Sequence, residues 1–276
     1  MTRAKTHSIS RNTARLLVLL VAFFGVMTYS VQAIEKAGEQ GRVFKGPMAK
    51  MSSVKITVLA TGKTADTVTD AEGQYQIPGQ IDDELIQVRA RGRFFDEHSG
   101  KLTKVPVVLT AITRHQDGDA APQVNLVSHL IATRINALAG SGSRGPFAAI
   151  VIPMVFPNAV SGVQEALEDA LPDLPSGVAD DLDPAAEGSL GQAQVIHVSL
   201  VVSEAANRRA RTIGADPGVG AQSLITDMTR DIFRYGRFSP AIASELRLAE
   251  RTMDGAAMLR NLVDAHGIGV DLIDSY

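Results

Sequence analysis

The hydrophobic periodicity of this sequence changes once along the chain, and that change limits the folds open to it. From residue 41 to residue 112 apolar residues alternate with polar ones, most plainly at 54–58. Such alternation is typical of β-strands that bury one face. Beyond Gly118 apolar residues recur about every 3.6 positions, which is typical of α-helices. The sequence therefore predicts a multi-domain chain, with an N-terminal all-β region followed by an all-α helical domain.

The first 33 residues have the layout of a signal peptide. Four basic residues and no acid precede an uncharged run at 16–27, and small side chains at 31 and 33 allow cleavage before Ile34. A membrane anchor needs about 20 apolar residues, so removal of residues 1–33 is favoured over retention as an anchor. After removal we expect no membrane span, because the apolar run at 147–156 is short and contains Pro153.

Composition excludes several classes of protein. The chain has no cysteine, so it has no disulfide framework, thiolate zinc site, iron–sulfur cluster or cysteine nucleophile. It has 27 Lys and Arg against 30 Asp and Glu, and four of the bases lie in the predicted signal peptide. The exported chain then carries a net charge of about −7, which gives it no electrostatic reason to bind nucleic acid.

The β region contains a clear hairpin signal at residues 69–75. Asp70 is placed to cap a tight turn with its side chain, and Gly73 to take the left-handed conformation that closes it. Frequent Gly and Pro residues predict several short strands with tight turns. Pro106 predicts that the last run, 105–112, is an edge strand or an irregular one.

A resemblance to a known family extends this interpretation. Residues 41–43 (GRV), 46–47 (GP), 54–59 (VKITVL) and 69–77 (TDAEGQYQI) together resemble the carboxypeptidase regulatory-like domain family. This resemblance implies a transthyretin-like β-sandwich of about seven strands over residues 40–115. The continuation at 90–100 (ARGRFFDEHSG) is similar to the variant of this domain in bacterial envelope and exported proteins. Such domains are usually accessories, so the resemblance indicates a fold more than a function.

The family name invites a search for a zinc peptidase, and the sequence lacks its ligands. None of the histidines beyond the signal peptide is followed by Glu in the His-x-x-Glu spacing that such enzymes use. The densest cluster of possible metal ligands is Asp96, Glu97 and His98, in a predicted loop. Calcium needs more oxygen ligands than these, so a solvated turn is favoured over a metal site. We expect no metal and no cofactor.

The helical domain is predicted over residues 122–276, with a loop-rich section at 140–190. Asn125 is a possible cap for the first helix, and Pro172 ends a short helix at 162–171. Further helices are predicted at about 192–209, 221–235, from Ser239 onward, and at 256–265. A β-domain of this size is marginally stable alone, so we expect the helices to bury part of its surface.

The favoured function is a non-enzymatic exported protein, a binding or structural module of the bacterial cell envelope, with an envelope protein or a glycan as partner. A periplasmic or secreted hydrolase remains open, with a serine, a histidine and an acid brought together from distant positions. A third alternative is a periplasmic subunit that acts in a complex through the apolar stretch 147–156. The sequence leaves open the ligand, the oligomeric state, and whether the protein is periplasmic, at the cell surface or secreted.

Overall fold

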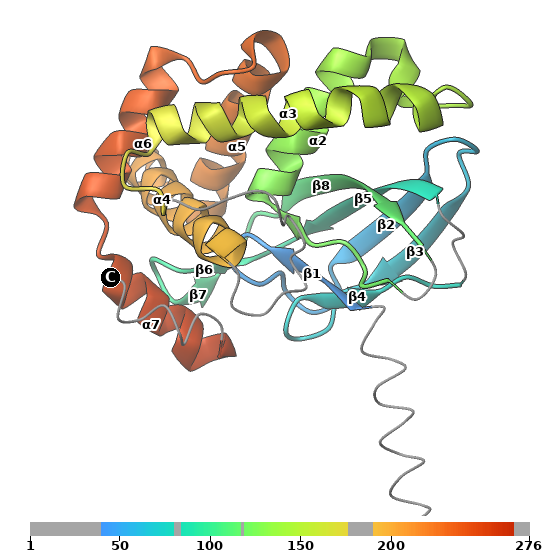
Figure 1. Cartoon of the computed structure of the whole chain (residues 1–276). Helices are drawn as coiled ribbons and strands as arrows, with labels where there is room; N and C mark the ends of the chain where they lie inside the picture. The colour runs from blue at the N-terminus through green and yellow to red at the C-terminus, as the bar shows by residue number, and fades with distance from the viewer. Residues whose placement is uncertain (1–39, 80–83, 117–118, 176–189, 268–276) are drawn as a thin grey trace, which may run out of the picture.

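The computed structural model describes residues 40–79, 84–116, 119–175 and 190–267. A β-rich region comes first and a helical region follows it (Figure 1). This order confirms the change of period seen in the sequence. The predicted signal peptide at 1–33 lies outside the described residues.

Most strands of the β region are short, as the frequent turn signals predict. The strands are β1 (Gln40–Phe44), β2 (Ser53–Val58), β3 (Thr64–Val68), β4 (Gln74–Gln76), β5 (Glu84–Gly92), β6 (Phe95–Asp96), β7 (Lys101–Leu102), β8 (Val107–His115) and β9 (Val124–Asn125). β5 and β8 are the exceptions, with nine residues each. Four of them form an antiparallel sheet in the order β3-β2-β5-β8. β2 and β5 are neighbours in it, with Val54 opposite Ala90 and Ile56 opposite Val88.

The other strands form two smaller sheets. β1 lies between β4, to which it is antiparallel, and β9, to which it is parallel. β6 and β7 form a two-stranded hairpin. β8 lies at one edge of the four-stranded sheet, directly after Pro106, so the predicted edge strand is confirmed. Pro106 lacks an N–H, which suits a residue outside the hydrogen-bonded ladder.

The turn before β4 forms as its sequence predicts. The Asp70 carboxylate accepts hydrogen bonds from the backbone N–H groups of Glu72 (3.0 Å) and Gln74 (2.7 Å). Gly73 has a φ of +75°, the left-handed conformation that a side chain disfavours. Local side-chain chemistry therefore closes this turn.

The helical region consists of α2 (Leu126–Ala139), the 3₁₀ turn η1 (Gly140–Ser143), α3 (Ala148–Ala170), α4 (Leu190–Ile213), α5 (Pro217–Tyr235), α6 (Pro240–Thr252) and α7 (Gly255–His266). Asn125 and Ser239 cap α2 and α6 through their side chains, and left-handed Gly236 and Gly267 end α5 and α7. The predicted starts at Asn125 and Ser239 and the predicted helix ends near 235 and 265 are confirmed.

α3 corrects the sequence prediction. The sequence placed a connector at 140–160 and a short helix from 162, but a helix fills 148–170 of the section predicted to be loop-rich. Pro153 and Pro157 lie inside this helix, and both are solvent-exposed. A proline leaves the carbonyl four residues earlier without its helical hydrogen bond. Here the carbonyls in question belong to Ala149 and Pro153, which are also exposed, so water can satisfy them.

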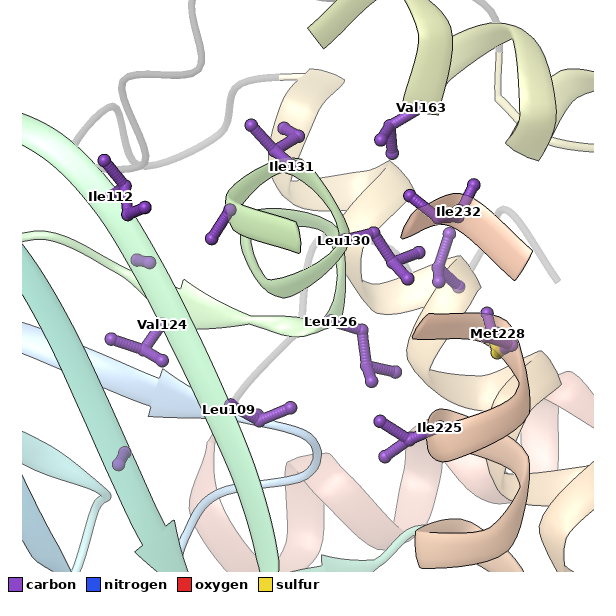
Figure 2. Close-up of a cluster of buried hydrophobic side chains, with 14 of the residues drawn as sticks. Leu109, Ile112, Val124, Leu126, Leu130, Ile131, Val163, Ile225, Met228 and Ile232 are labelled. Atoms are coloured by element: carbon purple, nitrogen blue, oxygen red, sulfur yellow. The ribbon is translucent and has the colours of Figure 1, made fainter. Parts of the chain in front are cut away.

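One hydrophobic core joins the sheets and the helices. Figure 2 shows α2 between β8 and α5, with Leu109 of β8 on one side and Ile225 and Met228 of α5 on the other. Val43 of β1 and Val54 of β2 belong to the same cluster of buried side chains. The helices therefore bury part of the β region, as its small size predicts.

α3 is also the one helix within the described part of the chain that is long and apolar enough to cross a membrane, judged by length and composition alone. Its residues Ile152, Val163 and Leu167 are buried in the common core. The expectation that no segment spans a membrane stays a prediction.

Candidate functional site

Asp96 and Glu97, where β6 ends and the turn to β7 begins, are buried, which contradicts the solvated turn expected for Asp96, Glu97 and His98; the rest of the turn, Ser99 and Gly100, is exposed. Asp96 is 1% exposed and Glu97 is 0% exposed, while the His98 side chain is 29% exposed. The two carboxylates point at α4, the long helix that packs beside this turn. Burying an ionised carboxylate is costly unless it is paired and hydrogen-bonded, so their partners decide what this turn does.

Glu97 is paired with Lys45, which follows β1. The Lys45 Nζ atom lies 3.3 Å from Glu97 Oε2, and neither side chain is exposed to solvent. The same ammonium donates to Ser203 Oγ (2.5 Å) and to the Ser199 carbonyl oxygen (3.4 Å). It also lies 4.9 Å from the centre of the Phe94 ring, within the range of a cation–π contact. The positive charge is thus fully enclosed by the protein.

Two serines of α4 complete the partners of Glu97. Ser199 Oγ donates to Glu97 Oε1 (2.6 Å), and Ser203 Oγ donates to Glu97 Oε2. Each carboxylate oxygen therefore accepts at least one hydrogen bond, and Oε2 also meets the ammonium of Lys45. Such full satisfaction is the condition under which a buried ion pair is tolerated.

Asp96 is hydrogen-bonded by a third residue of α4, Asn207, which lies four positions after Ser203. Asn207 Nδ2 donates to Asp96 Oδ1 (2.9 Å), and the backbone N–H of Ser99 donates to Oδ2 (3.0 Å). Ser199, Ser203 and Asn207 are spaced four apart, so they share one face of the helix. This polar stripe was not predicted from the sequence, although three small polar residues four positions apart, among apolar residues, are a readable signal.

Close backbone approach brings Lys45 to this position. The next residue, Gly46, has a φ of +64°, and a Cβ atom there would lie 1.8 Å from the carbonyl oxygen of Phe95. Only glycine fits both the conformation and the space. Phe44, directly before Lys45, and Phe95, two residues before Glu97, pack with Leu200 of α4 and Leu259 of α7 in a second hydrophobic cluster.

His98 faces a different partner at the edge of the buried network. Its Nδ1 atom lies 2.9 Å from Glu204 Oε2, and its Nε2 atom lies 2.5 Å from Arg211 Nη2. This arrangement fits the tautomer with the proton on Nδ1, which donates to the carboxylate while Nε2 accepts from the guanidinium. Arg208 lies 3.5 Å from the other oxygen of Glu204.

The three candidate metal ligands therefore do not share a site. Asp96 faces Asn207, Glu97 faces Lys45, and His98 faces Glu204. Within the described ranges no group of three or more His, Asp or Glu side chains is arranged to hold a metal ion. The ammonium of Lys45 already supplies the positive charge that Glu97 needs, so the arrangement favours an internal ion pair.

The same network contains the residue types of a hydrolase but encloses them. Ser203 lies beside both a lysine and a carboxylate, as an activated nucleophile would. Ser199 and Ser203 are each 1% exposed, so no substrate can reach either hydroxyl in this conformation. What this arrangement can do is fix the β6–β7 turn to α4.

His129 and His197 lie within helices α2 and α4. His197 Nε2 is 2.9 Å from Glu250 Oε1, and this pair joins α4 to α6 in the interior. His129 of α2 lies 3.2 Å from Thr229 Oγ1 of α5, and burial lowers the pKa of His129 to about 4. Both residues connect helices.

The exposed surface offers a different kind of candidate, on α3. Phe147 at its cap is 68% exposed, Ile150 is 62% exposed and Met154 is 72% exposed. Their spacing of three and four places them on one side of the helix. Most other large apolar side chains of α3 pack inward, whereas these three form an apolar strip that is largely exposed in the described part of the chain.

Comparison of the chain with models of protein families, with curated proteins and with solved structures finds no match. The resemblance to carboxypeptidase regulatory-like domains therefore stays a prediction that depends on the residues quoted for it.

Proposed function

We propose that this protein is a non-enzymatic, exported binding or structural module of the bacterial cell envelope, and that it contacts its partner through α3. The observation that carries the proposal is the apolar strip of Phe147, Ile150 and Met154. Exposed apolar side chains gathered on one helix face usually mark an interaction surface, because leaving them in water is unfavourable. Export is the expectation from the N-terminal charge and hydropathy pattern.

We further propose that residues 40–115 form a transthyretin-like sandwich of the carboxypeptidase regulatory-like kind. The four-stranded sheet and the β4-β1 pair support this, because Ile56 and Val88 of one share a hydrophobic core with Val43 and Tyr75 of the other. β9 (Val124–Asn125) extends the second sheet from beyond this range. In this proposal the sheets and the enclosed Lys45–Glu97 network form the rigid body on which α3 is presented. An envelope protein or a glycan is the expected partner.

Affinity capture from the native envelope fraction tests this proposal. The protein is purified after expression of the full-length chain, and its captured proteins and glycans are compared with those of Met154→Glu. We expect Met154→Glu to reduce capture at least tenfold, because a charge in the strip must be desolvated on binding. Leu248→Glu is the matched control, since Leu248 is another exposed apolar residue, on α6 (51% exposed). Equal capture by wild type and Met154→Glu would overturn the role of α3.

A further inference from the structure

One face of the four-stranded sheet carries basic side chains that the fold does not pair. β2 and β5 lie side by side in this sheet (Figure 1), with Lys55 opposite Arg89 and Ser53 opposite Arg91. Residues two apart in a strand share a face, so Lys55, Arg89 and Arg91 lie on the same face, and all three are exposed. Arg93, directly after β5, is exposed too. We call these four residues the basic sheet face.

Neutral polar side chains surround the charges. The register places Thr57 opposite Gln87, two positions from Lys55 and Arg89 on the same face, and Thr110 of β8 opposite Arg89. Their hydroxyl and amide groups can both donate and accept hydrogen bonds. The face therefore offers cations together with groups that bind hydroxyls.

The charges of this face are not neutralised within the described part of the chain. Asp66 of β3 is opposite Lys55, but no residue of the basic sheet face forms an ion pair with a described residue. Like charges directly opposite one another destabilise a sheet, and Lys55 and Arg89 are such a pair. A cost in stability with no compensating partner in the chain indicates an anionic ligand outside it.

We infer that the basic sheet face binds an acidic glycan, a linear chain with a carboxylate on each sugar. Arg89 and Arg91 are two residues apart, so these cations are about 7 Å apart along β5, and Arg93 follows them. A linear polyanion laid along this strand meets one guanidinium after another. Each guanidinium can hold a carboxylate through two parallel hydrogen bonds, while the neighbouring hydroxyl and amide groups bond the sugar hydroxyls.

Other anionic partners fit this face less well. Single-stranded nucleic acid stacks its bases on aromatic side chains, lipid surfaces take up apolar side chains, and protein interfaces are centred on buried aromatic or aliphatic ones. The outward positions of the paired strands contain no aromatic residue, and Val68 is their one strongly exposed large apolar side chain (43%). Charge complementarity together with the polar surroundings therefore favours an acidic glycan.

This inference goes beyond the proposed function, because it assigns a second surface that does not involve α3. The two surfaces respond to different variants. Met154→Glu should leave binding of the acidic glycan unchanged, and loss of the basic side chains should leave unchanged whatever the α3 strip captures. The failure of one proposal is therefore distinguishable from the failure of the other.

Isothermal titration calorimetry of the full-length chain with oligogalacturonate tests the inference. We expect a Kd of roughly 100 μM or tighter at about 50 mM salt. Raising the salt to about 300 mM should weaken binding at least fivefold, because salt screens exposed charges. Arg89→Gln combined with Arg91→Gln should weaken it at least tenfold. Neutral dextran oligosaccharides should not bind.

A matched double variant separates this face from net charge. Arg251→Gln combined with Arg260→Gln also removes two exposed arginines, from α6 and α7, and should leave the affinity within about twofold of wild type. Thermal unfolding checks that the Arg89 and Arg91 variant folds. Its midpoint should equal or exceed that of wild type, because the like charges at Lys55 and Arg89 no longer repel.

Several results would overturn the inference. Wild type that does not bind oligogalacturonate would do so, and so would equal losses of affinity in the two double variants. A lower unfolding midpoint in the Arg89 and Arg91 variant would show that the fold needs these charges. Binding of poly-glutamate, single-stranded DNA or anionic vesicles through Arg89 and Arg91, as tight as that of oligogalacturonate, would assign the face to that other class.

Discussion

Lys45 and Glu97 form an ion pair of 3.3 Å at a point where neither side chain is exposed to solvent. The two residues are 52 positions apart in sequence, and α4 covers the pair with two serines. A buried pair of this kind contributes little net stability compared with apolar residues of similar size, but breaking it by removing one partner is costly. The pair therefore acts mainly on specificity, because it holds the β6–β7 turn and α4 in one arrangement.

Replacing Lys45 by methionine tests whether this junction maintains the fold. Lys45→Met leaves the Glu97 carboxylate buried without its cation, so we expect a loss of about 3–5 kcal/mol in the free energy of unfolding. Urea denaturation followed by circular dichroism measures the loss. Lys55 is exposed on β2 and gives the control, because Lys55→Met should change stability by less than about 0.5 kcal/mol.

A double variant separates the ion pair from simple packing. Adding Glu97→Gln to Lys45→Met removes the unpaired charge while keeping an oxygen for Ser199 and Ser203. We expect the double variant to be less destabilised than the sum of the two single ones, with a coupling of at least about 1 kcal/mol. Strict additivity would show that the two charges do not interact.

Gly46→Ala tests the close approach that places Lys45. The added Cβ atom meets the carbonyl oxygen of Phe95 at 1.8 Å, at a φ of +64°. We expect a loss of about 3 kcal/mol or more, because backbone strain and a steric clash act together. Gly62→Ala is the control: Gly62 has a φ of +74° with open space around it, so only the backbone strain of about 1 kcal/mol should appear. Similar losses at both positions would contradict the packing argument.

His129 predicts a pH dependence of stability. Burial lowers the pKa of His129 to about 4 in the folded protein, whereas an unfolded histidine titrates near 6.5. At His129 the unfolded chain therefore binds a proton more readily than the folded chain. The contribution of the neutral His129 to the free energy of unfolding is present above pH 6.5 and is lost as the pH falls toward 4. Wild type should lose on the order of 3 kcal/mol more than His129→Gln over this interval. Denaturation curves at pH 7 and 4.5 check this, and NMR titration of His129 near pH 6.5 would contradict it.

Arg209 joins three helices, and its geometry predicts that lysine cannot replace it. Its guanidinium bonds both oxygens of Glu245 on α6 (2.6 and 2.7 Å) and one oxygen of Asp227 on α5 (2.7 Å). Lysine has no planar fork for two parallel bonds, so Arg209→Lys should lower the free energy of unfolding by about 1 kcal/mol. Arg251, exposed at the end of α6, supplies the control, and Arg251→Lys should be neutral. If Arg209→Lys and Arg251→Lys changed the free energy of unfolding equally, the two parallel hydrogen bonds from Arg209 to Glu245 would contribute nothing to stability.

Local chemistry explains which elements were predictable. The turn at Asp70 and Gly73, the caps at Asn125 and Ser239, and the end of α5 at Gly236 depend on residues within four positions of one another. Alternation of apolar and polar residues made β2 and β5 recognisable as strands that bury one face each. The class and order of the elements could therefore be predicted from the sequence alone.

α3 shows where a local rule was insufficient. Pro153 and Pro157 predicted a connector because proline removes a helical hydrogen bond. In the folded chain both lie on the solvent side, and Ile152, Val163 and Leu167 on the other side are held in the core. Tertiary packing and solvation of the exposed carbonyls outweigh the local preference, and neither is visible from spacing alone.

The sequence by itself determined the β-then-helix order, the turns and most helix ends, because these depend on periodicity and on contacts between near neighbours. Only the tertiary structure decided that Asp96 and Glu97 are buried and that His98 faces Glu204. Glu97 meets Ser199 across 102 positions and Lys45 across 52, and no short-range pattern carries that information. Whether a charged turn is solvated or enclosed depends on which distant element covers it, and that is settled when the chain packs.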